Sequence, residues 1–256
     1  MSDQQDIAMQ TLTQHVTELR KRIMWCFLAM IAGTAICYIF REPIYGFLVQ
    51  PLADAMGDGG TNRLIYTGLT EAFFMYLKVA FFAGCFLTFP VILSQIWMFV
   101  APGLYKNEKK VFLPYLVVTP VLFFLGGALV YYLIIPMAWQ FFLGFQSSGT
   151  ETVLPIQLEA RVGEYLDLVM TLIFAFGLCF QLPVLLTLLA QAGIVTANNL
   201  RNFRKYAVVA IFTVAAIITP PDVISQIGLA IPICLLYELS IYLVSRIEKG
   251  RHAKSS

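Results

Sequence analysis

The sequence predicts an all-α membrane protein with six transmembrane helices, both termini in the cytosol, and a curved bundle of proline-kinked helices. Composition, the spacing of long apolar runs and the distribution of Lys and Arg support this prediction. Of the 256 residues, 59% are hydrophobic and 12% are charged, and the mean hydropathy is +0.77. Soluble domains have about 45–50% apolar and about 25% charged residues. Lipid is therefore the solvent that accommodates this much apolar surface.

Six apolar stretches can serve as spans, because a span needs about 20 mostly apolar residues. They lie at about residues 23–40, 73–100, 111–135, 165–192, 206–218 and 224–244. Together they are expected to form a single polytopic membrane domain over residues 1–256. The fifth and sixth stretches are short, and only Thr219-Pro220-Pro221-Asp222 separates them, which predicts a tight helical hairpin. Proline ends the first helix there, and Asp222 can cap the second.

Lys and Arg residues concentrate in alternate connections between the stretches. Most of them precede the first, lie between the second and third, lie between the fourth and fifth, or follow the sixth: Arg20, Lys21, Arg22, Lys106, Lys109, Lys110, Arg201, Arg204, Lys205, Arg246, Lys249, Arg251 and Lys254. The opposite connections, residues 41–70 and 139–163, are expected to be long outer loops and are richer in Asp and Glu. The positive-inside rule therefore places both termini in the cytosol.

Two further features concern helix geometry. Leu12, Val16, Leu19 and Ile23 recur at helical spacing, which predicts an amphipathic entry helix lying at the cytosolic surface. Prolines within the predicted spans each remove a backbone donor and bend their helix: Pro90, Pro114, Pro120, Pro136, Pro183 and Pro232. We therefore expect a curved bundle whose concave face could serve as a docking surface for other proteins.

Residues that typically carry enzyme chemistry are scarce. His15 and His252 lie outside the predicted spans, and the sequence has no HExxH, GxSxG or Gly-rich phosphate loop. The five cysteines lie in apolar runs without CxxC spacing, as core residues in a bilayer do: Cys26, Cys37, Cys85, Cys179 and Cys234. We therefore expect no catalytic residue, metal site, cofactor or nucleic-acid partner.

Polar side chains are few within the predicted spans, and three of them are singled out as candidates: Lys78, Gln181 and Glu238. Polar groups are costly in a membrane, so each is a candidate for a functional role. Lys78 and Glu238 can instead extend toward the interface, and Gln181, which precedes Pro183 closely, can bridge helices. If the three formed an ion path, the chain would be a small-solute secondary transporter, although no inverted repeat favours that alternative.

The connection between the second and third spans combines an apolar stretch, a Pro102-Gly103 turn and a carboxylate at the membrane surface. Glu108 stands among Lys106, Lys109 and Lys110. Their positive charges favour the ionised carboxylate. From these residues alone, a solvated turn bordered by aromatic side chains and a binding surface are both consistent interpretations.

That connection and four other segments resemble the TatC family, the multispan core of the twin-arginine protein translocase. The matching segments are residues 15–22, Gln50-Pro51-Leu52, Phe89-Pro90-Val91 through Glu108, Ala175-Phe176-Gly177 with Pro183, and Thr219-Pro220-Pro221-Asp222-Val223 with Ser225-Gln226. They extend from residue 15 to residue 226, so the resemblance covers essentially the whole chain. The Pro102 connection and the Thr-Pro-Pro-Asp hairpin are specific when they occur together.

The resemblance implies a core receptor and scaffold of the twin-arginine translocation complex in the bacterial cell inner membrane. Such proteins bind signal peptides that carry two adjacent arginines. With the single-span proteins TatA and TatB, they transport folded proteins using the proton-motive force. The signal-peptide-binding residues that the resemblance implies are Glu18, Arg20, Phe99 and Glu108. Two carboxylates suit two guanidinium groups, because these pairs are bidentate and geometrically selective.

The resemblance also implies polar contacts with partner helices at Gln181, Thr219 and Gln226. The surface for TatA and TatB is expected around the fifth span and the start of the sixth. Many TatC proteins have a glutamate at the position of Gln181, whereas the amide here forms hydrogen bonds but cannot ionise. A multi-copy complex is expected, because a folded cargo domain is larger than any gap that six helices enclose.

Overall fold

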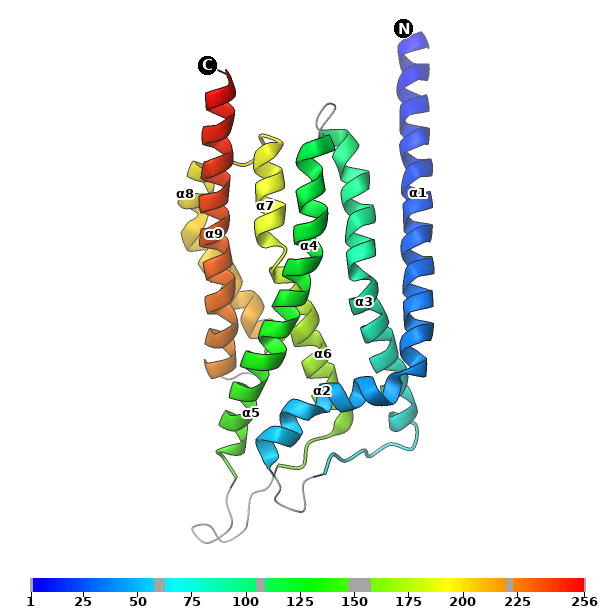
Figure 1. Ribbon diagram of the computed structural model, residues 1–256, viewed down its shortest axis with the longest axis vertical. Helices are drawn as coiled ribbons and strands as arrows, with labels where there is room; N and C mark the ends of the chain where they lie inside the picture. The colour runs from blue at the N-terminus through cyan, green and yellow to red at the C-terminus, as the bar shows by residue number, and fades with distance from the viewer. Residues whose placement is uncertain (1, 58–62, 105–108, 147–157, 220–222, 256) are drawn as a thin grey trace.

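The computed structural model describes residues 2–57, 63–104, 109–146, 158–219 and 223–255, with side chains at 16–57, 63–99, 114–146, 158–219, 223 and 225–250. Nine α-helices and one π-helix lie within these ranges (Figure 1): α1 Ser2–Ile39, α2 Arg41–Met56, α3 Glu71–Leu104, α4 Lys109–Leu129, the π-helix η1 Val130–Ile134, α5 Ile135–Leu143, α6 Val162–Cys179, α7 Leu182–Gln191, α8 Ala197–Ile218 and α9 Val223–Ser255. Extended pairing in the same ranges is limited to one bridge between Ile65 and Arg161. The predicted all-α class is confirmed.

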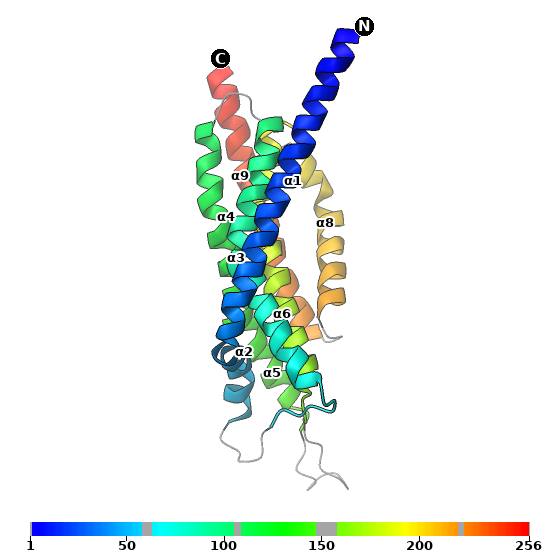
Figure 2. The same ribbon diagram turned by 90° about the vertical axis from the view of Figure 1, so that its right-hand side faces the viewer.

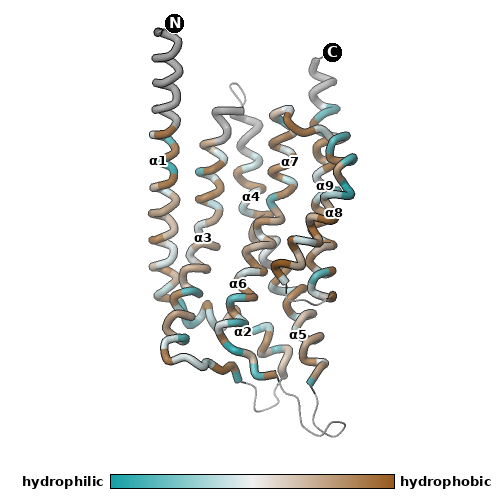
Figure 3. The backbone as a smooth tube through the Cα atoms, turned by 180° about the vertical axis from the view of Figure 1, so that it is seen from behind, coloured by the Kyte–Doolittle hydropathy of each residue, from teal (hydrophilic) through white to brown (hydrophobic). Residues whose placement is uncertain are grey.

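Five helical segments of the described chain are long and apolar enough to cross a bilayer: Val16–Ile39, Glu71–Phe99, Pro114–Leu143, Val162–Gln191 and Ser225–Gly250. They match the predicted first, second, third, fourth and sixth spans, and Figure 3 shows their long hydrophobic stretches. The predicted fifth span, residues 206–218, lies in α8. This helix begins at Ala197, and its first half carries Arg201, Arg204 and Lys205, so it does not join the five.

The two chain ends lie at the same end of the helix assembly (Figure 1). The end of α3 and the start of α4 are also at that end, whereas α2 lies at the opposite end.

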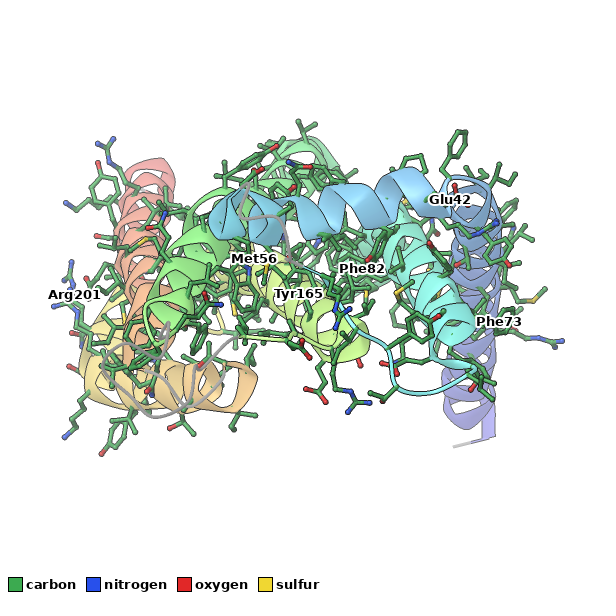
Figure 4. The ribbon with its side chains drawn as sticks, turned by 90° about the horizontal axis from the view of Figure 1, so that it is seen from below. Glu42, Met56, Phe73, Phe82, Tyr165 and Arg201 are labelled. Atoms are coloured by element: carbon green, nitrogen blue, oxygen red, sulfur yellow. The ribbon has the colours of Figure 1, made fainter. Side chains whose placement is uncertain are left out.

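Two expectations about the amino-terminal part of the chain are wrong. The predicted surface helix before the first span is instead the start of α1, one continuous helix of 38 residues. Residues 2–32 contain no Gly or Pro, so nothing in the sequence interrupts helical hydrogen bonding there. Residues 41–70, expected as a loop, contain the 16-residue helix α2. Seen from below, α2 crosses the ends of the other helices from Glu42 to Met56 (Figure 4).

The predicted third and sixth spans both extend beyond their predicted ends. The third continues from α4 through η1 into α5 and ends at Leu143. The sixth is not short, because α9 has 33 residues and its apolar segment runs from Ser225 to Gly250. In both places the apolar helical segment continues past the predicted boundary.

Two prolines coincide with changes in helix geometry. Pro136 lacks an N–H and would collide with the carbonyl of Tyr132 in a regular helix. The preceding turn widens to η1, in which the N–H of Ile135 donates to the carbonyl of Val130. Pro183 lies in the first turn of α7, immediately after the turn at Phe180 and Gln181 that ends α6.

Helices α1 and α3 lie side by side (Figures 1 and 2) and approach closely at small residues. A Cβ atom at Gly33 would lie 2.6 Å from Cγ2 of Thr88, and one at Gly84 would lie 2.5 Å from the backbone N of Thr34. Small residues allow this close approach, as is common between membrane helices. Much of the remaining surface of α1 is exposed and apolar.

Candidate functional site

Glu18 lies at the end of α1 that carries the N-terminus, and Arg22 holds its carboxylate. Arg22 donates to Oε1 of Glu18 through Nη2 at 2.5 Å and through Nε at 3.2 Å. The two residues are four apart, the spacing that places side chains on one helix face. The side chain of Arg22 is 20% exposed and that of Glu18 is 42% exposed. The carboxylate is therefore oriented by its own helix and still accessible from outside the bundle.

Arg22 also connects α1 to α3, because its Nη1 donates to Oε1 of Gln95 at 3.4 Å. Phe99 follows Gln95 by one turn of α3 and is half-buried. The helices α1 and α3 run in opposite directions (Figure 1). The step of one turn from Arg22 to Glu18 therefore points the same way as the step of one turn from Gln95 to Phe99. The structure thus brings Glu18 and Phe99 to the same end of the α1–α3 pair.

Arg20 is not part of this arrangement. Two residues along a helix correspond to about 200° of rotation, so Arg20 lies on nearly the opposite face of α1 from Glu18. It is exposed and lines a shallow groove on α1 with Lys21, Met24 and Leu28. Glu108 lies outside the described residues, so the structure does not test its predicted proximity to Glu18.

Arg22 and Gln95 were not among the predicted site residues. The spacing of Glu18 and Arg22 could have revealed their ion pair, because oppositely charged residues four apart commonly interact on a helix. The contact with Gln95 depends on how α1 and α3 align. No spacing within either segment reports that alignment.

Gln181 lies at the break between α6 and α7 and is 9% exposed. Its Nε2 donates to the backbone carbonyl of Thr119 on α4 at 3.1 Å. Its Oε1 is buried and has no hydrogen-bond partner among the described residues. The amide therefore bridges two helices, one of the two interpretations that the sequence left open, and retains an unused acceptor.

Thr219 and Gln226 lie on either side of the turn between α8 and α9. The hydroxyl of Thr219, which ends α8, donates to the carbonyl of Ala215 at 2.9 Å. Nε2 of Gln226 on α9 donates to the carbonyl of Phe212 on α8 at 3.3 Å. The Gln226 contact joins the two helices of the hairpin, whereas the Thr219 contact stays within the end of α8. The expected cap, Asp222, lies outside the described residues.

Lys78 and Glu238 form ion pairs between neighbouring helices. Nζ of Lys78 on α3 lies 2.8 Å from Oδ2 of Asp167 on α6. Nη2 of Arg204 on α8 lies 2.5 Å from Oε2 of Glu238 on α9. With Gln181 bonded to α4, the three groups of the alternative ion path lie in three separate helix contacts.

The contacts of α2 were missed entirely by sequence reasoning. The hydroxyl of Tyr131 in η1 donates to the carbonyl of Phe47 at 2.6 Å, and their rings stack with centroids 4.2 Å apart. The hydroxyl of Tyr165 on α6 donates to the carbonyl of Leu48 at 2.9 Å. Two tyrosines thus fasten α2 to the bundle beside Pro51.

These features define a multispan helical membrane protein whose polar groups mainly join helices. In the part of the chain that the structure describes, no group of three or more His, Cys, Asp or Glu side chains could hold a metal ion. The sequence profile of one family, described as Sec-independent protein translocase protein (TatC), matches residues 14–232.

Characterised proteins of the same description are similar over most of their length. The Sec-independent protein translocase protein TatC of Magnetococcus marinus is 50% identical over 240 residues, which cover 94% of this chain and 86% of that protein. The TatC protein of Rickettsia prowazekii is 45% identical over 238 residues, covering 93% and 94%. A crystal structure of a twin-arginine translocase receptor, TatC, matches with a TM-score of 0.77 and 35% identity over 90% of this chain and 97% of that one. The chain belongs to the TatC family and is a component of a protein translocase, not an enzyme.

Proposed function

We propose that this chain is the core receptor and scaffold of a twin-arginine translocation complex. It binds twin-arginine signal peptides and, with TatA and TatB, transports folded proteins using the proton-motive force. Its similarity to a solved twin-arginine translocase receptor supports this function. The observation that carries the binding site is the accessible carboxylate of Glu18, held by Arg22 at the same end of α1 and α3 as Phe99.

Glu18 is proposed to accept one guanidinium group of the signal peptide. Its carboxylate has about four acceptor positions, and Arg22 uses Oε1. Because Arg22 already balances the charge of Glu18, a second peptide arginine calls for another carboxylate, which we assign to Glu108. Phe99 would pack against an apolar residue near the arginine pair. Arg20, exposed on another face of α1, would contact acceptors of the peptide outside that pair.

A peptide-binding assay on the full chain in lipid nanodiscs tests this assignment. Glu18→Gln and Glu108→Gln should each weaken binding of a twin-arginine peptide about thirtyfold or more, because removing one partner of an interfacial charge pair costs about 2–5 kcal/mol. Glu42→Gln, at the opposite end of the bundle, is the matched control (Figure 4). A twin-lysine peptide should bind the unmodified protein less tightly, since lysine lacks the bidentate fork.

Equal affinity for the two peptides would contradict the receptor assignment. Unchanged binding by a folded Glu18→Gln protein would remove Glu18 from the site while leaving Glu108 to be judged by its own variant.

We further propose six spans in a single membrane domain, with both ends in the cytosol of a bacterial inner membrane. The 22 residues of α8 extend about 33 Å at 1.5 Å per residue, and the apolar residues 206–218 account for about 20 Å of this length. This apolar part would cross a locally thinned bilayer while Arg201, Arg204 and Lys205 remain at the cytosolic surface. In a cysteine-free background, Asn199→Cys should react with an impermeant maleimide only from the cytosolic side, and Arg63→Cys only from the outer side. The same side for both would exclude this topology.

Partner helices are proposed to pack on α8 and the start of α9, with Gln181, Thr219 and Gln226 as polar contacts. Exposed apolar side chains on α8, including Val209 and Ile217, support a packing surface there. The acceptor of Gln181 is buried, so a partner's donor would have to enter the break between α6 and α7 to reach it. A photoreactive amino acid at Val209 or Ile217 should capture TatA or TatB, and one at Val118 on α4 should not. Capture from Val118 alone would refute this surface.

A further inference from the structure

An apolar pocket of about 350 Å³ lies between α3 and α4 on the inner side of α2. Residues of three helices, α2, α3 and α4, supply most of its wall: Ile44, Phe47, Phe82, Phe86, Phe124 and Gly127. Phe82 lies beside α2 in the view from below (Figure 4). The pocket is thus inside the membrane-spanning part of the bundle, in the half that α2 closes.

This pocket is poorly suited to water. A buried water needs about two to four polar partners, but the polar side-chain groups of the lining are the hydroxyls of Tyr131 and Tyr132 and the thiol of Cys37. Tyr131 already donates its hydroxyl proton to the carbonyl of Phe47. The side chain of Tyr132 is 70% exposed. At about 30 Å³ per molecule, roughly a dozen waters would fill the volume with few bonds to the protein.

The pocket opens sideways, toward the surroundings of the bundle. Lining residues on three helices are substantially exposed at its edge: Phe47, Leu87 and Phe124. Since α3 and α4 are both span segments, the medium outside this opening is the hydrocarbon of the bilayer.

The width of the pocket indicates which apolar group fills it. Its α3 and α4 walls approach closely, because the ring centroids of Phe86 and Phe124 lie 5.3 Å apart. An α-helix with side chains is about 10–12 Å across, so a whole partner helix does not enter between these walls, whereas a single flexible hydrocarbon chain does. We propose that the pocket binds one acyl chain of a phospholipid from the bilayer leaflet at the α2 end. This inference is independent of the proposed signal-peptide binding.

Photolabelling with a lipid probe tests the proposal. The full chain is reconstituted in nanodiscs of phosphatidylethanolamine that contain a phospholipid with a diazirine in one acyl chain. After illumination, the labelled residues are mapped by mass spectrometry. Labelling of Phe47, Leu87 and Phe124 should exceed that of Ile31, an exposed residue of α1.

Filling the pocket should exclude the chain. Ala83→Phe and Ala128→Phe each add a ring to the lining and should lower labelling of the pocket residues at least tenfold. Ala32→Phe, on an exposed part of α1, is the matched control and should leave labelling unchanged. Unfolding midpoints identify variants that still fold.

Three results would overturn the proposal: labelling no stronger in the pocket than at Ile31, labelling that persists in folded pocket-filled variants, or displacement of the lipid label by a photoreactive signal peptide that labels the same residues. If neither filled variant folds, the comparison with Ile31 in the unmodified protein decides. None of these results depends on whether twin-arginine and twin-lysine peptides are distinguished.

Discussion

The hydroxyl of Tyr131 donates a 2.6 Å hydrogen bond to the carbonyl oxygen of Phe47, the oxygen that Pro51 leaves without a helical donor. In a regular helix, the N–H of residue 51 would bond to that carbonyl, and proline has no N–H. A neighbouring helix thus supplies the missing donor, as is typical of prolines tolerated in membrane proteins. The Gln50-Pro51-Leu52 segment of the sequence therefore marks the point where α2 is fastened.

Tyr131→Phe should destabilise the protein by about 1 kcal/mol, because it removes the donor to a partly buried carbonyl. Reversible unfolding in mixed micelles measures the effect. Tyr132→Phe is the matched control, since the adjacent side chain is largely exposed, and it should change stability by less than about 0.5 kcal/mol. Equal effects of the two substitutions would show that the bond to Phe47 contributes little.

Gly84→Ala should separate α1 from α3. The new methyl group would lie 2.5 Å from the backbone N and 2.6 Å from Cα of Thr34, neither of which can rotate away. Overpacking of this kind costs about 1–3 kcal/mol. Unfolding free energy and spin-label distances between α1 and α3 measure the outcome. Gly46→Ala has no heavy atom within 4 Å of the added Cβ, and should leave the distances unchanged.

Gln181→Leu should cost about 0.6 kcal/mol, and at most about 1.7 kcal/mol, which is the range for hydrogen bonds between membrane helices. The substitution removes the bond from Nε2 to the carbonyl of Thr119 while keeping an apolar side chain. Gln140→Leu, on an exposed part of α5, is the control. A gain in stability from Gln181→Leu would mean that the unused Oε1 costs more than the bond contributes.

The ion pair between Lys78 and Asp167 should contribute less than about 1 kcal/mol, because about half of each side chain is exposed and exposed pairs are weak. A double-mutant cycle with Lys78→Gln and Asp167→Asn measures the coupling. The pair of Arg63 and Glu159, at 3.7 Å, should couple still more weakly. A coupling above about 2 kcal/mol would indicate that lipid, not water, surrounds the Lys78 pair.

The spans were predictable because hydrophobic length is a property of each segment alone. The same local signal failed for α2, because Pro51 and the polar residues Gln50 and Asp54 are typical of a loop. The helix is stabilised by hydrogen bonds from Tyr131 and Tyr165, which are distant in the sequence. It also failed for the start of α1, where amphipathic spacing was taken for a separate surface helix. A continuous helix has the same spacing.

The candidate binding site was predictable only in part. The resemblance to TatC selected Glu18 and Phe99, and the structure brings both to one end of the α1–α3 pair. The partners that orient them, Arg22 and Gln95, depend on the alignment of two helices. Alignment is set by the close contact at Gly33 and Gly84, whose size requirement is visible only when both helices are present.

A tilt of α1 about its close contact with α3 at Gly33 and Gly84 would move the N-terminal part of α1. Glu18 lies 15 residues from Gly33, or about 22 Å at 1.5 Å per residue. A tilt of about 10° around the contact would move the carboxylate by about 4 Å, more than the length of a hydrogen bond. The 3.4 Å contact between Arg22 and Gln95 joins the two helices one turn from Glu18. A small tilt of α1 at the glycine contact would therefore change the distance between Glu18 and the peptide arginine that we propose it binds.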